Sequence, residues 1–289
     1  MAASVIPRKV AAERFWETLD GRRADARRTL ALTKRFIERY CADPRFRQLL
    51  KENADTPQRA TEAYRIPLDP RLALPLFHPD FTQFRFSDRA AEKWPLAKEW
   101  DDYLTGIAEC RPLYRQTGDC PDANPRFHAW RQRQIRRTEN ELGPVAAMIQ
   151  HPVFAFELSA GCSVGCWFCG VSAEKFAGNF PYTDGNVRLW RSILDRTVEL
   201  FGTAAQAGFC YWATDPSDNP DYPRFLEDYY HATGSLPQTT TARPLRDLNF
   251  TRTLLRLTRR YRSLPNRFSI LTLESLQCGP RDFQRRGTP

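Results

Sequence analysis

Three cysteines stand close together near the middle of the chain. Cys162, Cys166 and Cys169 follow a C-x3-C-x2-C spacing, and each has a glycine next to it. Three thiolates on one short loop can bind three irons of a [4Fe–4S] cluster and leave the fourth iron without a protein ligand. The glycines suit such a loop because wrapping a chain around a cluster calls for unusual backbone angles. The spacing therefore predicts a [4Fe–4S] cluster with one iron open to a small molecule.

Two other interpretations of these cysteines stay open. A structural zinc site needs four nitrogen or sulfur ligands, and His151 or Cys210 would have to supply the fourth, although neither has a short spacing to the motif. Alternatively, the three thiols are simply buried, which their polar and glycine-rich surroundings disfavour. Ligand count and spacing favour the iron–sulfur cluster.

The composition limits the class of protein. Of 289 residues, 42% are hydrophobic and 27% are charged, so the chain is expected to fold around a sizeable core. No stretch approaches the ~20 consecutive apolar residues of a membrane helix, and the N-terminus lacks the apolar segment of a secretory signal. Eight cysteines are too few for a disulfide-stapled secreted domain. These features predict a cytoplasmic protein with reduced thiols and no membrane partner.

The chain is basic, with 43 Lys and Arg against 34 Asp and Glu, a formal charge of +9. Its arginines gather in three clusters at helical spacing, around residues 22–28, 131–137 and 252–262. Such clusters are either solvated helix faces or a surface that attracts an acidic peptide or a nucleic acid. No aromatic residues of the kind that stack on single-stranded bases are interleaved with the arginines, which argues against nucleic acid as the partner.

The first 150 residues are predicted to be mainly helical. Apolar residues recur at intervals of three and four over residues 23–41, and a short helix is expected at 46–51. Further helices are expected at 96–109 and 126–142. Six prolines between residues 56 and 95 predict an extended connection with little regular structure.

From residue 151 the pattern changes to an alternation of short β-rich runs and amphipathic helices. The predicted strands are 153–159, 208–213, 238–242 and 267–273, and the predicted helices are 187–201, 222–233 and 248–261. Strand–helix alternation at this pitch favours parallel βαβ units in an α/β sheet or barrel. We therefore place a domain boundary between a helical region, 1–150, and an α/β core, 151–289.

The motif belongs to a longer pattern. Residues 156–173 are FELSAGCSVGCWFCGVSA, residues 211–222 are YWATDPSDNPDY, and residues 267–271 are RFSIL. The cysteine motif, with an aromatic residue before its last cysteine, resembles that of the radical S-adenosyl-L-methionine (SAM) superfamily. The longer pattern, over about residues 125–271, resembles the peptide epimerases of that superfamily. The resemblance implies a partial (βα)n TIM-like barrel with about four visible βα units, a [4Fe–4S] cluster held by Cys162, Cys166 and Cys169, and SAM bound at the open iron.

The resemblance also implies roles for residues outside the motif. Phe168 lies where the superfamily packs an aromatic residue near the adenine of SAM. Asp215, with Thr214 beside it, occupies the place of the turn that binds the amino group of SAM, and Ser269 is a candidate for a hydroxyl contact to SAM. For Asp215, a simple Asp-Pro turn is an equally good interpretation.

The chain departs from the superfamily towards its C-terminus. After Leu271 the sequence becomes polar and the alternation ends. The resemblance implies a barrel of six βα units, and only four strands can be placed in this chain. This predicts a truncated C-terminus. The thiol that gives hydrogen to the peptide would belong, by resemblance, to the part beyond this end. Cys210 is the candidate within the chain, although a buried free cysteine is the commoner outcome.

The predicted function is radical epimerisation of L- to D-residues in a ribosomally made precursor peptide. An α-hydrogen of an internal residue is not acidic enough for an ordinary side-chain base, which is why radical chemistry from a cofactor suits the task. The partners would be the precursor, with its leader docked on residues 1–150, and a reductant such as flavodoxin or ferredoxin. The alternatives are another radical SAM peptide maturase, an RNA-modifying enzyme, or an inactive truncated remnant.

Overall fold

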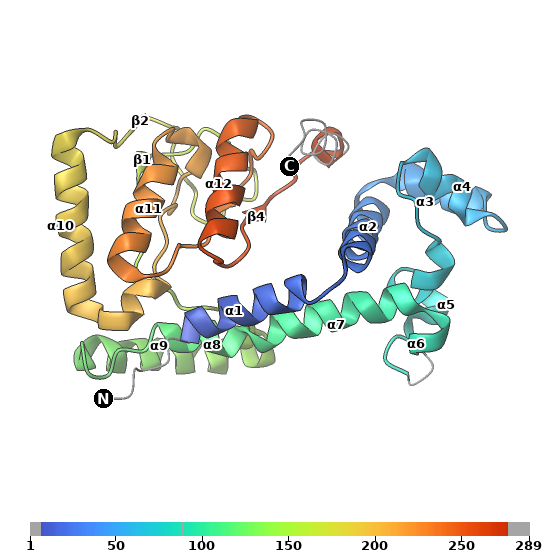
Figure 1. The fold of residues 1–289 in the computed structure, drawn as a ribbon, viewed down its shortest axis with the longest axis horizontal. Helices are drawn as coiled ribbons and strands as arrows, with labels where there is room; N and C mark the ends of the chain where they lie inside the picture. Colours follow the sequence, from blue (N-terminus) through green and yellow to red (C-terminus); the bar gives the residue numbers. More distant parts are fainter. Residues whose placement is uncertain (1–6, 88–89, 277–289) are drawn as a thin grey trace. The chain divides into compact units, whose positions relative to one another are not determined.

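A computed structural model describes residues 7–87 and 90–276, and helix is its main secondary structure (Figure 1). The chain divides into two compact units. The first unit comprises the described residues of Met1–Trp16 and Cys110–Pro289, and the second unit is Glu17–Glu109. The boundary expected between residues 150 and 151 lies inside the first unit.

The second unit is a group of helices around a small aromatic core. Its longer helices are α2 (Ala24–Ala42), α3 (Pro44–Glu52) and α7 (Pro95–Glu109), which confirms the helices expected there. Asp43 precedes α3, and its carboxylate accepts hydrogen bonds from the N–H groups of Arg45 and Phe46. Phe36 and Phe46 are fully buried and pack edge to face, with ring centroids 5.7 Å apart.

The expectation of an extended connection over residues 56–95 was wrong. This segment forms four short helical elements, α4 (Pro57–Ala63), η1 (Pro70–Leu76), α5 (Pro79–Thr82) and α6 (Ala90–Lys93). The first three begin at a proline. Proline suits the first position of a helix, because its fixed φ is helical and the N–H it lacks would have no partner there. The prolines therefore start short helices here as well as ending them.

The first unit holds the helices from residue 111 onward. They are α8 (Arg111–Thr117), α9 (Pro125–Leu142), α10 (Asp184–Phe201), α11 (Tyr222–Thr233) and α12 (Leu248–Arg260), with 3-10 turns η2 (Gly143–Met148), η3 (Gly202–Ala207) and η4 (Pro216–Asp218). The helices expected at 126–142, 187–201, 222–233 and 248–261 are confirmed. The start of α1 (Pro7–Asp20) also belongs to this unit, since Arg8 donates to the Gln206 carbonyl and Trp16 to the Ser263 carbonyl, each at 2.8 Å.

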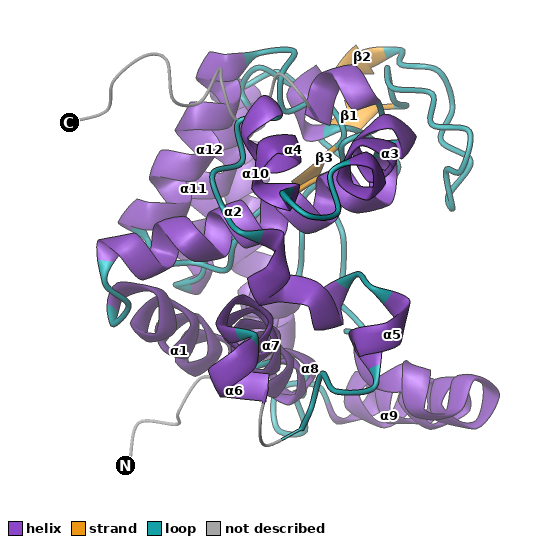
Figure 2. Ribbon diagram, turned by 90° about the vertical axis from the view of Figure 1, so that its right-hand side faces the viewer, coloured by secondary structure: helices purple, strands orange, loops and turns teal. Residues whose placement is uncertain are grey.

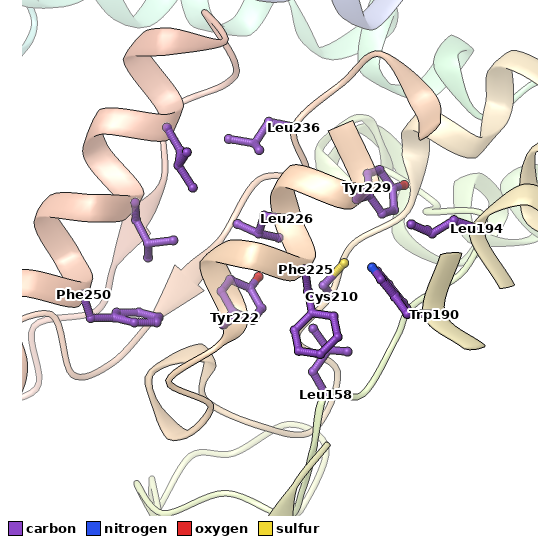
Figure 3. Close-up of a cluster of buried hydrophobic side chains, with 12 residues drawn as sticks. Leu158, Trp190, Leu194, Cys210, Tyr222, Phe225, Leu226, Tyr229, Leu236 and Phe250 are labelled. Carbon is purple, nitrogen blue, oxygen red and sulfur yellow. The ribbon is translucent and has the colours of Figure 1, made fainter. Parts of the chain in front are cut away.

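Helices α10, α11 and α12 lie side by side and cover the core of the first unit (Figure 1). Phe225 of α11 is fully buried and packs edge-on against Trp190 of α10, with ring centroids 5.6 Å apart. Leu158, from the segment before the cysteines, and Cys210 lie in the same cluster (Figure 3). The core therefore joins the helices to the backbone that leads into the cysteine motif.

The predicted α/β barrel is wrong. In the described residues, regular strands form only two sheets of two strands, and each strand has two residues (Figure 2). β1 (Ser159–Ala160) pairs antiparallel with β2 (Gly178–Asn179), and β3 (Thr240–Thr241) pairs parallel with β4 (Arg267–Phe268). The predicted strands at 153–159 and 208–213 meet in a single parallel bridge between Ala155 and Phe209.

The reason lies in what the alternating pattern reports. Phe154 and Phe156 alternate as in a strand, and both pack against the helical core. Burial of every second side chain produces this period whether or not neighbouring segments complete a hydrogen-bonded ladder. After the bridge at Phe209 the chain bends at Cys210 and turns at Trp212 and Ala213, where Ala213 has a positive φ of 52°. The polar segment after Leu271 was predicted to mark a truncated end. Its part beyond residue 276 lies outside the described residues.

Candidate functional site

The cysteine loop, residues 161–173, is closed at its base by the strands β1 and β2. The Cys162 N–H donates to the Glu174 carbonyl at 2.8 Å, next to the β1–β2 pairing. Gly161 has a positive φ of 71°, and a Cβ there would lie 2.4 Å from the Lys175 carbonyl oxygen. Only glycine combines this backbone angle with so close an approach. Gly161 thus sets the point at which the loop departs from the β1–β2 pairing.

The three thiols of the loop are partly exposed and differ in their surroundings. Burial raises the pKa of the Cys166 thiol, and the neighbouring Cys162 and Cys169 raise it further. Backbone N–H groups lower the pKa of Cys169, with that of Ala173 the largest contributor at an N···Sγ distance of 3.5 Å. The Val164 N–H lies equally close to the Cys162 sulfur. Cys166 is thus the thiol whose pKa is raised by both of the other motif cysteines.

The donor types of the loop are those that an iron–sulfur cluster takes. Three thiols come from one loop, and amide N–H groups lie at hydrogen-bonding distance from two of the sulfurs, an arrangement that stabilises thiolates and tunes cluster potentials. Within the described ranges, no three His, Cys, Asp or Glu side chains converge closely enough to enclose a metal ion. In this structure, therefore, His151 and Cys210 do not complete a zinc site with the motif, and the three motif thiols themselves are not drawn together around one metal position.

An acidic side chain from elsewhere in the first unit holds the cysteine loop. The Asp218 side chain, 2% exposed, accepts hydrogen bonds from the N–H of Ser163, at 2.9 Å, and from its hydroxyl. Arg243 donates to the Ser163 hydroxyl and carbonyl at 2.9 and 2.6 Å. Arg246 forms an ion pair with Asp218 at 2.9 Å. The sequence could not predict the contact between Ser163 and Arg243, because no local spacing links residues that lie 80 positions apart.

Asp215 has a structural role in the described residues. Its buried carboxylate accepts from Ser217 N–H, at 2.9 Å, from the Thr241 hydroxyl, at 2.8 Å, and from Ala242 N–H, at 2.8 Å. These bonds cap η4 and attach it to β3. The Asp-Pro turn expected as one interpretation is present, and the contact between Asp215 and SAM stays a prediction.

The other implied cofactor residues lie at different places around the loop. The Thr214 hydroxyl is enclosed and has no hydrogen-bond partner among the described residues. Ser269 lines a separate hollow with Arg243 and Arg246. Phe168 is half exposed and packs edge-on against Trp167, which is 94% exposed. The structure therefore separates Thr214 from Ser269, which the resemblance had assigned to the same ligand.

Cys210, the candidate hydrogen donor, is fully buried in the helical core between Trp190 and Phe225 (Figure 3). Burial raises the pKa of its thiol. It does not line the cavity described next, although both its neighbours in sequence do. Its role as a donor stays a prediction that would need the core to open.

A cavity of about 440 Å³ lies in the first unit beside the cysteine loop, and we call it the Arg8 cavity. This volume is within the usual range for small-molecule sites. Cys169 and Thr214 line it, together with the guanidinium-bearing side chain of Arg8. Its remaining walls are mainly apolar and aromatic, including Tyr114, Phe209, Tyr211 and Trp212. The cavity thus brings a motif thiol, the unpartnered Thr214 hydroxyl and two guanidinium groups, those of Arg8 and Arg267, to the same half-open space.

Comparisons with known proteins leave the function open. The chain is 49% identical over 270 residues to an uncharacterized protein, y4wI, of Sinorhizobium fredii. The match covers 93% of this chain and 52% of the relative, so the chain spans about half the length of that protein. No protein-family model matches the chain. No solved structure matches it either.

A search of the described helices finds none with the length and apolar character needed to cross a membrane.

Proposed function

We propose that the chain is a radical SAM enzyme that epimerises residues of a ribosomally made precursor peptide. The observation that carries the proposal is the position of the cysteine loop. A C-x3-C-x2-C motif lies on one anchored loop, and its last cysteine lines a cavity of a size that suits a small molecule.

In this proposal Cys162, Cys166 and Cys169 hold a [4Fe–4S] cluster. When bound and reduced, such a cluster supplies the electron that cleaves SAM. The chain's own residues then have three tasks. Backbone N–H groups at Val164 and Ala173 stabilise thiolate sulfur, the apolar walls of the Arg8 cavity exclude water, and the free Thr214 hydroxyl offers a hydrogen bond to a ligand.

The peptide step would need a precursor and a reductant such as flavodoxin or ferredoxin. The support for a peptide as substrate is the resemblance of residues 156–173, 211–222 and 267–271 to the peptide epimerases. Residues 1–150 are a candidate docking region for the leader. A thiol that returns hydrogen to the α-carbon is not assigned, since Cys210 is enclosed in the core.

The proposal is tested by SAM cleavage. The protein is purified without oxygen, reconstituted with iron and sulfide and reduced with dithionite, and 5′-deoxyadenosine is measured. We expect product from the wild type and from Cys41→Ala, a control at an exposed cysteine outside the loop, and none from Cys166→Ala. Equal product from the Cys166→Ala variant, or none from the wild type, would refute the proposal.

The peptide step has its own readout. A candidate precursor peptide is incubated with the reduced protein and SAM in deuterated water and analysed by mass spectrometry. Epimerisation predicts solvent deuterium at α-carbons of the product. SAM cleavage without deuterium in the peptide would retain the radical SAM assignment and reject the epimerase.

A further inference from the structure

Arg8 is a part-buried cation with no ion pair among the residues that the structure describes. Its Nη1 donates to the Gln206 carbonyl at 2.8 Å, and its Nε is enclosed with no hydrogen-bond partner among the residues that the structure describes. A guanidinium carries five N–H donors, and burial without a counter-charge is costly. The side chain therefore has donors and charge to offer to a ligand.

The groups around Arg8 do not neutralise it. The ionisable groups that act most strongly on its charge are three tyrosines and one cysteine, namely Tyr229, Tyr114, Tyr211 and Cys210. Burial raises the pKa of Tyr114, Tyr229 and Cys210, so these three stay protonated and uncharged near neutral pH. Burial also lowers the pKa of Arg8 itself, as expected for a charge that lacks a carboxylate partner.

The cavity around this cation defines the rest of the ligand. Its walls include the rings of Tyr114, Phe209 and Trp212, which suit an apolar or aromatic body. The cavity has a second guanidinium, that of Arg267, but this side chain is exposed and already donates to the Thr240 and Tyr211 hydroxyls. Arginine is the side chain that binds planar carboxylates with two parallel hydrogen bonds.

We propose that the Arg8 cavity binds the carboxylate of an apolar ligand on the Arg8 guanidinium. The carboxylate belongs either to the methionyl part of SAM or to a substrate peptide, and the experiment below separates these two sources. The binding site itself does not depend on the proposed function, since neither Arg8 nor the cavity walls require a cluster.

The first test uses the purified protein without added iron, and a matched pair of probes. Phenylacetate and phenylacetamide have the same ring and differ in charge, and their binding is followed by ligand-observed NMR titration. We expect the wild type to bind the carboxylate about tenfold more tightly than the amide. Equal affinities for the two probes would overturn the proposal without any variant.

Variants then assign the preference to Arg8. We expect Arg8→Gln to lose the preference for phenylacetate and Arg8→Lys, which keeps the charge but not the planar fork, to keep part of it. Lys9→Gln removes the same charge from an exposed neighbour on α1 and is expected to behave as wild type. Circular dichroism verifies that each variant is folded. A folded Arg8→Gln variant that keeps the preference would contradict the assignment.

Equilibrium dialysis identifies the source of the carboxylate. One arm uses SAM, and the other uses a phenylalanine-ended peptide with a free or an amidated C-terminus. The arm in which Arg8→Gln weakens binding by about tenfold names the natural ligand. Unchanged binding in both arms would overturn the proposal. Ligand binding and SAM cleavage are separate measurements. If the wild type cleaves SAM but binds neither ligand through Arg8, this inference fails and the proposed function stands; if it binds a ligand through Arg8 but cleaves no SAM, the proposed function fails and this inference stands.

Discussion

Cys166 and Cys169 lie three positions apart in one loop and differ in chemistry. Backbone N–H groups face Cys169 and lower its pKa, whereas burial and the two other thiols raise the pKa of Cys166. The motif spacing predicted that these residues act together, which stays a prediction. The spacing carried no information on which sulfur is the better thiolate, because that depends on the fold of the backbone around each one.

This difference predicts an order of reaction in the protein without iron. A lower pKa gives more thiolate at a given pH, so Cys169 is expected to react with iodoacetamide ahead of Cys166 near pH 7.5. The difference should shrink as the pH rises and both thiols ionise. Mass spectrometry of timed samples measures the modified fraction at each cysteine. Faster labelling of Cys166 would show that the loop has a different conformation.

Asp218 is one of the residues that attach the cysteine loop to the rest of its unit. Replacing it with alanine leaves the Ser163 N–H and Arg246 without their acceptor, and we expect the free energy of unfolding to fall by about 2 kcal/mol. Asp195→Ala, at an exposed position of α10, is the control and should change it by less than about 0.5 kcal/mol. Urea denaturation compares the two, and equal effects would exclude a role for Asp218 in holding the loop.

At the scale of elements, the long helices were predictable and the strands were not. Periodicity and capping residues are local signals, and they located α2, α9 and α11 closely. The alternation at residues 153–159 reports burial of alternate side chains and does not report pairing, so it overstated β structure. The network of Ser163, Asp218 and Arg243 depends on tertiary structure, and no local pattern announces it.

Helix capping gives a prediction at this scale. The Asp247 carboxylate accepts from the N–H groups of Asn249 and Phe250 at the start of α12, at 2.8 and 3.0 Å. Asp247→Ala is expected to destabilise the protein by about 1 kcal/mol, and Asp247→Ser should restore most of the loss. Thr183 precedes α10 without a side-chain cap, so Thr183→Ala should be nearly neutral. Thermal unfolding tests the pair, and similar losses in both alanine variants would contradict the cap assignment.

At the scale of the whole molecule, each unit has its own core. Phe225 anchors the aromatic cluster of the first unit, and Phe36 that of the second. The sequence predicted a helical N-terminal half but placed a boundary inside the first unit. Residues 7–16 join that unit through hydrogen bonds to Gln206 and Ser263, which lie far along the chain and have no local signature.

The two cores predict two separate responses to mutation. Removing a buried aromatic side chain costs about 3–5 kcal/mol. Phe225→Ala is therefore expected to raise amide hydrogen exchange mainly in α10, α11 and α12, and Phe36→Ala mainly in α2 and α3. Exchange mass spectrometry on the two variants makes the comparison. The same pattern of exchange in both would contradict the division into two cores.

The central claim is that the cysteine loop holds a [4Fe–4S] cluster, and the most direct measurement is the metal content of the protein after anaerobic reconstitution. Iron and acid-labile sulfide are determined per chain, together with zinc, for the wild type, Cys162→Ala and Cys41→Ala. We predict about four irons and four sulfides in the wild type and in Cys41→Ala, and loss of the cluster in Cys162→Ala. Zinc in place of iron, or iron content that does not depend on Cys162, would contradict the account.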